Sequence, residues 1–160
     1  MPRVMVFIDA SNLSYRLDCV KLVERLLKGR TLVDTHVYGS QSDPPWEKRT
    51  RFFRHISAHR FNLHIFEIPP AARRGQEKQV DVALAVDLLW YAFYDSYDVA
   101  ILVSGDGDFI PAVQKVVQLG KSLEVAAFTR NLSPKLQKEC SDIHFLDPLE
   151  KELLLGRWVG

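Results

Sequence analysis

The sequence predicts an α/β fold in which a mostly parallel central sheet carries helices on both faces. Short apolar segments alternate with longer segments of helical periodicity along the 160 residues. Residues 99–103 are five consecutive apolar residues, a pattern typical of a parallel strand buried on both faces. Because strands that alternate with helices in this way are joined by right-handed crossovers, the helices are expected on both sides of one sheet.

The elements are expected in a regular order that begins with a strand over residues 4–8. The helix predicted over 13–28 follows it and ends at Gly29, a favoured C-cap residue. The helix over 80–94 has a broad apolar surface, so it is predicted to be well buried. The other predicted elements are strand 31–38, helix 46–60, strand 61–68, strand 99–103, a helix with Pro111 in its first turn, strand 122–128, a short helix that starts at Pro134 after the cap Ser133, strand 143–146 and helix 148–155.

Composition favours a soluble, cytoplasmic protein with one domain over residues 1–160, in which 148–160 form a C-terminal helix and tail. The net charge is +1, so any attraction to nucleic acid must come from local basic patches. No apolar run approaches the length of a membrane span, and we expect no membrane partner. Cys19 and Cys140 fit no paired motif and are predicted to be free thiols in a reducing compartment.

Acidic side chains follow two predicted strands and open one predicted helix. Asp106 and Asp108 come directly after strand 99–103, while Asp9 and Asn12 come after strand 4–8. Asp81 lies in the first turn of a helix that follows another strand through a loop. Because parallel strands end at one edge of the sheet, these groups are expected in one pocket. Helix capping is the alternative explanation for each acid taken singly.

A divalent cation would relieve the repulsion between gathered carboxylates. Oxygen-only ligands favour Mg²⁺ or Mn²⁺, and Asp9, Asp81, Asp106 and Asp108 are the predicted ligands. Such an ion orients water and stabilises a phosphoryl transition state. Asn12 and Ser104 are predicted to hydrogen-bond water or phosphate. Three cations at the rim, Arg73, Arg74 and Lys78, are predicted to bind a phosphodiester strand, with a solvated surface as the alternative.

Other chemistries are disfavoured by the sequence. The pair His55 and His59 has helical i,i+4 spacing but lacks the glutamate of a zinc-protease motif. No glycine-rich dinucleotide or phosphate-binding motif is present, and there is no nucleophile elbow. Asp87 lies six residues after Asp81, about 120° away around the helix, so a structural role is expected for it. The aromatic residues Tyr15, Tyr38 and Trp46 are either base-stacking groups or core residues.

Three segments, residues 7–12, 78–87 and 103–109, resemble the motifs of the NYN domain family, in its LabA-like branch, within the PIN-like nuclease superfamily. The resemblance spans roughly residues 3 to 147 and extends to 125–128, Leu136 and 141–143. It implies a PIN-like three-layer α/β/α sandwich and a metal-dependent ribonuclease site. By motif, the implied cluster consists of Asp9, Asn12, Asp81, Asp106 and Asp108, with Ser104 and Lys78 beside it.

The leading hypothesis is therefore an endoribonuclease that hydrolyses RNA with Mg²⁺ or Mn²⁺. A regulatory or RNA-interaction module without catalysis is the main alternative, because the net charge is near zero and no separate RNA-binding domain is evident. A third hypothesis is a phosphatase or DNA nuclease that uses the same cluster. The apolar C-terminal residues 153–158 predict either docking onto the chain itself or a homodimer contact.

Overall fold

The computed structural model describes residues 1–69 and 78–156 and has an α/β fold built on one sheet of six parallel strands. The predicted fold class is therefore confirmed. The strands lie in the order β3-β2-β1-β4-β5-β6. Their bounds are β1 Arg3–Asp9, β2 Thr31–Ser42, β3 Asn62–Ile68, β4 Val99–Val103, β5 Ser122–Ala127 and β6 Asp142–Phe145.

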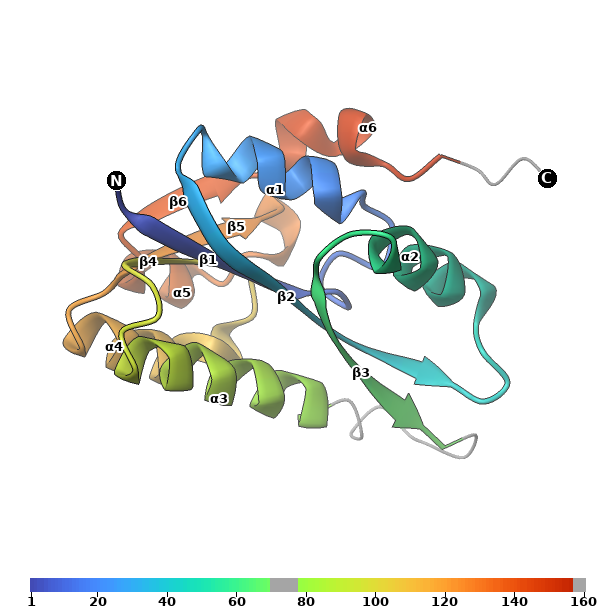
Figure 1. Ribbon diagram of the computed structural model, residues 1–160, viewed down its shortest axis with the longest axis horizontal. Helices are drawn as coiled ribbons and strands as arrows, with labels where there is room; N and C mark the ends of the chain where they lie inside the picture. The colour runs from blue at the N-terminus through green and yellow to red at the C-terminus, as the bar shows by residue number, and fades with distance from the viewer. Residues whose placement is uncertain (70–77, 157–160) are drawn as a thin grey trace.

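Helices cover both faces of the sheet, as Figure 1 shows. One face packs against α1, α2 and α6, and the other against α3, α4 and α5. The six helices in the described ranges are α1 Cys19–Leu27, α2 Glu47–Ser57, α3 Lys78–Phe93, α4 Ile110–Gln118, α5 Pro134–Glu139 and α6 Glu150–Leu153. None of them is both long and apolar enough to cross a membrane.

The strand order places a topological switch between β1 and β4. From β1 the chain moves outward through β2 to β3, then returns to β4 on the other side of β1. Such a switch opens a crevice at the carboxyl ends of the strands, where ligands bind in open α/β sheets. Dinucleotide-binding folds share this strand order. Here, however, the chain after β1 reads Ala10, Ser11 and Asn12 rather than a glycine-rich turn.

The predicted helix 13–28 begins later than expected, at Cys19. Ser14 and Tyr15 both adopt positive φ angles of 54°, which a helix cannot accommodate. Asp18 then caps α1 by accepting hydrogen bonds from the backbone N–H groups of Val20 and Lys21. The early part of the predicted helix is therefore a turn segment. Its Tyr15 ring is buried in the core, and the Tyr15 hydroxyl accepts a hydrogen bond from the backbone N–H of Ser40.

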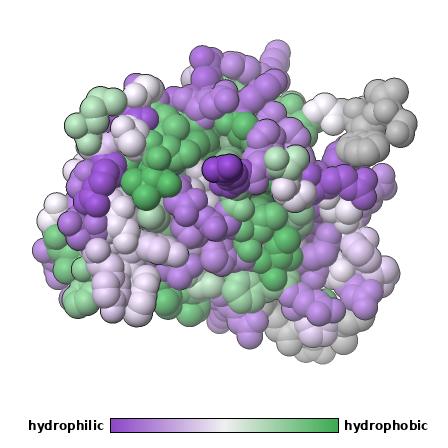
Figure 2. Space-filling model, viewed as in Figure 1, coloured by the Kyte–Doolittle hydropathy of each residue, from purple (hydrophilic) through white to green (hydrophobic). Residues whose placement is uncertain are grey.

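The prediction that residues 80–94 form a well-buried helix is wrong for its outer side. The inner side of α3 packs on the sheet through Val80, Leu84, Leu88 and Ala92. The side facing away from the sheet is exposed, since no other described element covers it. The exposed side chains on it are Val82, Val86, Trp90, Phe93 and the adjoining Tyr94. On the face that Figure 2 draws, hydrophobic side chains gather in separate patches between hydrophilic ones.

The C-terminal segment docks onto its own chain. Leu153 is fully buried in the core formed with α1, and Leu154 forms an antiparallel bridge with Leu17. Only Glu150–Leu153 of the predicted helix 148–155 is α-helical, because a 3-10 turn, Asp147–Leu149, precedes it. Trp158 lies outside the described residues. Docking is thus confirmed for the described part, and self-association stays a prediction.

Candidate metal centre

Three carboxylates meet at the carboxyl edge of the sheet. Asp81, Asp106 and Asp108 each offer an oxygen, and these three atoms lie within 4.8 Å of one another. Asp106 and Asp108 come from the turn after β4, and Asp81 comes from the first turn of α3. The convergence expected for these three residues is therefore present. An all-oxygen donor set at this spacing suits a hard divalent cation such as Mg²⁺ or Mn²⁺.

A pocket of about 320 Å³ opens beside these carboxylates. Asp81 and Asp108 lie in its wall together with Phe109, whose side chain is buried. Lys78 also lines the pocket, as expected for a cation at the rim. Arg73 and Arg74 lie outside the described residues. The pocket wall thus combines two carboxylates with one lysine that can contact an anionic ligand.

Asp9 lies beside the three carboxylates rather than among them. It is 2% exposed, and each of its carboxylate oxygens accepts a hydroxyl hydrogen bond. Ser11 Oγ donates to one oxygen at 2.9 Å, and Ser104 Oγ donates to the other at 3.0 Å. Burial raises the pKa of Asp9 above its usual value, and these hydrogen bonds, with one from the backbone N–H of Asn12, oppose that rise.

Ser104 connects Asp9 to the turn that carries Asp106. Its hydroxyl donates to Asp9 and accepts a hydrogen bond from the backbone N–H of Asp106 at 3.2 Å. The side chain is fully buried, so the substrate contact expected from the sequence does not match its position. The geometry fits a positioning role, in which Ser104 holds the Asp106 turn against the end of β1.

Asp106 caps a turn and also belongs to the carboxylate group. Its Oδ1 accepts a hydrogen bond from the backbone N–H of Asp108 at 2.9 Å and caps the 3-10 turn Gly107–Phe109. Its carboxylate also belongs to the group that includes Asp81. Capping therefore orients this side chain without removing it from the candidate metal centre.

Asn12 is part of the scaffold of the same turn. Its Oδ1 accepts a hydrogen bond from the backbone N–H of Gly105 at 3.1 Å, and its backbone carbonyl accepts one from Asn131 Nδ2 at 3.2 Å. The backbone N–H of Ser133 donates to the Gly105 carbonyl at 2.8 Å. The turn after β4 is therefore held between the loops that follow β1 and β5.

Replacing Gly105 with Ala is expected to destabilise the chain by about 3 kcal/mol, the upper range for overpacking. A Cβ at this position would lie 2.6 Å from the carbonyl carbon of Asn131 and 2.8 Å from the Cα of Leu132. Because these are backbone atoms, the whole turn must shift. Chemical denaturation measures the change. The matched control is Gly156→Ala, whose Cβ would meet nothing within 4 Å, and an equal loss in both variants would contradict this explanation.

Asp87 faces another part of the molecule, as its angular distance from Asp81 predicts. Its Oδ2 accepts a hydrogen bond from the Tyr38 hydroxyl at 2.7 Å. Tyr38 is fully buried and Tyr15 is nearly so, which makes both of them core residues rather than base-stacking groups. Trp46 is about half exposed and keeps a surface position.

Sequence reasoning missed Ser11 and Asn131 at this site. Ser11 follows Asp9 by only two residues, and its hydroxyl donates to the Asp9 carboxylate. That local signal was available. The approach of Asn131 to Asn12 spans 119 residues and depends on β4 and β5 being neighbours, which the sequence does not reveal.

Adjoining pockets run from Ser11 along α2, on the face of the sheet opposite α3. The first is lined by Ser11, Trp46 and Lys48 among others, and the next shares Tyr15 and Lys48 with it. A third shares Arg51 with the second. We call this series the α2 track. The basic side chains that line it are Arg16, Lys21, Lys48, Arg49, Arg51 and Arg54.

Comparisons with known proteins identify a domain family and a similar fold. A sequence model of the NYN domain family matches residues 3–149. Among solved structures, a protein of unknown function from Vibrio parahaemolyticus RIMD 2210633 is similar, with a TM-score of 0.76 and 22% identity over 96% of each chain. At that identity the likeness concerns the fold alone. The search of curated proteins finds no match.

Proposed function

Since the chain belongs to the NYN domain family and has a PIN-like nuclease fold, we propose that it is an endoribonuclease that uses Mg²⁺ or Mn²⁺. The convergence of Asp81, Asp106 and Asp108 at the carboxyl edge of the sheet carries this proposal. The finer placement in the LabA-like branch is also a proposal, and it rests on the motifs around Asp9, Asp81 and Asp106.

Each residue of the centre has a proposed role. Asp81, Asp106 and Asp108 would hold the cation, which would supply electrostatic stabilisation for the charge that develops on a phosphoryl group. Asp9 would contact the ion through water, and through Ser104 it orients the Asp106 turn. Asn12 fixes Gly105, and its amide Nδ2 is a candidate donor to water or phosphate. Lys78 binds a phosphate at the pocket rim, and Arg73 and Arg74 are proposed to do the same.

The α2 track is the proposed path of the RNA strand toward the centre. Its basic side chains suit phosphate contacts, and its first pocket includes Ser11, which hydrogen-bonds Asp9. Arg49 is assigned a structural role rather than phosphate binding. Its guanidinium donates to Ser40 and lies 4.3 Å from the ring centroids of both Tyr15 and Trp46. Of the other five basic side chains, Lys48 and Arg51 are the leading phosphate-binding candidates, because each lines two of the three pockets.

Lys48→Glu is expected to weaken binding of single-stranded RNA about tenfold near physiological salt. It is also expected to reduce the slope of log affinity against log salt by about 0.7, the contribution of one phosphate contact. Fluorescence anisotropy at several salt concentrations measures both quantities. Lys138→Glu on α5, at the opposite face, is the matched control. Equal losses in the two variants would show that net charge, rather than the track, governs binding.

The test of the proposed function is cleavage of a mixed RNA pool by the intact chain with Mg²⁺ or Mn²⁺, and with a chelator as control. Cleavage that requires the ion supports the proposal. RNA binding without cleavage under every ion condition would favour the regulatory or RNA-interaction module. Parallel assays with DNA and a phosphomonoester separate a ribonuclease from a DNA nuclease or phosphatase.

Three further features are proposed rather than demonstrated. Residues 1–160 form a single domain, with 148–160 as its C-terminal helix and tail. The protein is cytoplasmic, which fits the two free thiols of Cys19 and Cys140. The third proposed feature is a homodimer, and light scattering of the intact chain measures the mass of the particle in solution.

A further inference from the structure

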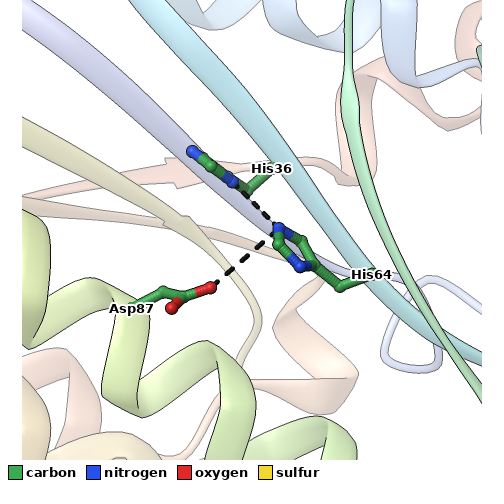
Figure 3. A group of neighbouring side chains, drawn as sticks. All are labelled: His36, His64 and Asp87. Atoms are coloured by element: carbon green, nitrogen blue, oxygen red, sulfur yellow. Dashed lines mark hydrogen bonds and ion pairs between the residues drawn. The ribbon is translucent and has the colours of Figure 1, made fainter.

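A second group of metal-ligand side chains lies on the α3 face of the sheet, separate from the carboxylate centre. It consists of His36 on β2, His64 on β3 and Asp87 on α3, and Figure 3 shows the three side chains pointing toward one another. We infer that His36, His64 and Asp87 bind a transition-metal cation of the zinc class, with a water molecule in the remaining position. This inference does not depend on the proposed nuclease function.

The spacing of the donor atoms fits such an ion. His36 Nδ1 lies 3.0 Å from His64 Nε2, and His64 Nε2 lies 3.9 Å from Asp87 Oδ2. One ligand atom from each residue lies within 4.8 Å of the others. Zinc–nitrogen and zinc–oxygen bonds of about 2.0–2.1 Å in a tetrahedron place neighbouring ligand atoms roughly 3.3 Å apart. The His64–Asp87 separation is thus about half an ångström wider than a tetrahedron requires. Without metal the two imidazoles share a hydrogen bond, which the ion would replace.

The donor types select the kind of ion. Imidazole suits zinc and its neighbours in the transition series, whereas magnesium prefers oxygen ligands and retains its water. Two imidazoles and one carboxylate form a ligand set known from catalytic zinc sites. The two candidate centres in this chain are thus expected to differ in preference, with Mg²⁺ or Mn²⁺ at Asp106 and a zinc-class ion at His64.

Outer contacts orient the ligands as metal sites require. The Tyr38 hydroxyl donates to Asp87 Oδ2 at 2.7 Å, which fixes that carboxylate. His36 Nε2 is buried and has no hydrogen-bond partner in the described part of the chain, but it lies 3.9 Å from Asp34 Oδ2. A metal on Nδ1 requires the proton on Nε2, on the side of Asp34. The 3.9 Å separation would have to shorten to hydrogen-bond length to complete a carboxylate–histidine–metal arrangement.

The surroundings hold the rings while leaving one side open. His36 is 3% exposed and stacks on the Phe7 ring, with centroids 5.6 Å apart. The ring of His64 stacks on Tyr38 at 4.5 Å, with an angle of 6° between the planes. About one third of the His64 side chain and 28% of the Asp87 side chain remain accessible. Solvent can therefore reach the position that the three protein ligands leave open.

Another group with possible ligands, Glu124, Asp142 and His144, does not support the same inference. The Glu124 carboxylate is already neutralised by Arg30, at 2.6 Å and 3.0 Å, and is hydrogen-bonded to His144 at 2.7 Å. A cation would have to displace this guanidinium from a largely buried site. Asp87 has no such arginine or lysine partner among the described residues.

An ion at this site would join β2, β3 and α3. The same helix α3 contributes Asp81 to the carboxylate centre. Binding at His64 and Asp87 would therefore restrict the element that positions Asp81.

The test is a Co²⁺ titration of the intact chain in excess Mg²⁺, which competes for any site made of carboxylates alone. We expect one Co²⁺ per chain, with visible absorption bands that Zn²⁺ abolishes by displacement. His64→Gln is expected to weaken binding at least about 100-fold. His59→Gln on the exposed end beyond α2 is the matched control and is expected to change it less than about twofold.

X-ray absorption of the Co²⁺-loaded wild-type chain gives an independent reading, even if His64→Gln fails to fold. Two imidazole ligands and oxygen donors are expected. An oxygen-only coordination sphere, the absence of saturable Co²⁺ binding, or an equal loss in His59→Gln would overturn the inference. None of these results bears on whether the Asp106 centre cleaves RNA, so the two proposals can fail separately.

Discussion

Asp106→Asn is expected to lower metal-dependent RNA cleavage roughly 1,000-fold while leaving the fold intact. Loss of a ligand removes several kcal/mol of electrostatic stabilisation from the cation site, and about 4 kcal/mol corresponds to that factor. The fold survives because asparagine keeps the oxygen that accepts the Asp108 N–H hydrogen bond. Cleavage rates at saturating Mn²⁺ measure the effect.

The same variant is expected to be slightly more stable than the wild type in the absence of metal. It removes one of three clustered negative charges, a gain of a few tenths of a kcal/mol for like-charge neighbours. Mn²⁺ should raise the melting temperature of the wild type and not that of Asp106→Asn. Glu67→Gln, an exposed acid on β3, is the matched control. Undiminished cleavage by Asp106→Asn would remove this residue from the centre.

Ser104→Ala is expected to lower the cleavage rate by about 10- to 100-fold, the range for residues that orient metal ligands. The Ser104 hydroxyl bonds to both the Asp9 carboxylate and the Asp106 N–H, and alanine removes both of these hydrogen bonds. Loss of this hydrogen bond also raises the pKa of Asp9 further, because burial already disfavours its charged form. Stability is expected to fall by about 2 kcal/mol.

The kinetic pattern separates positioning by Ser104 from substrate binding. Since Ser104 is fully buried, the KM for RNA is expected to stay within about twofold while kcat falls and the Mn²⁺ requirement rises. Ser122→Ala at the exposed start of β5 is the matched control. A raised KM with unchanged kcat would instead assign Ser104 to direct substrate contact.

Much of the fold follows from sequence patterns because each depends on neighbouring residues. The five apolar residues of β4 form the strand with its predicted bounds, and Ser133 caps the helix that begins at Pro134. The meeting of Asp81 with Asp106 follows from a general rule, since parallel strands end at one edge. These predictions needed no knowledge of which strands are neighbours.

The remaining features depend on contacts between distant segments. The approach of His64 to His36 requires the register that pairs β2 with β3, and nothing local specifies it. Whether the outer side of α3 is exposed depends on whether another element covers it. The apolar residues of the helix do not reveal this by themselves. The burial of Asp9 behind Ser11 and Ser104 was likewise not predicted, because side-chain orientation is decided by the assembled core.

The most direct test of the central claim is a Mn²⁺ soak of crystals of the intact chain, read by anomalous diffraction. A peak between the carboxylates of Asp81, Asp106 and Asp108 is the predicted result. Crystals with no Mn²⁺ there, or with arginine and lysine side chains filling the space among the three carboxylates, would contradict the account.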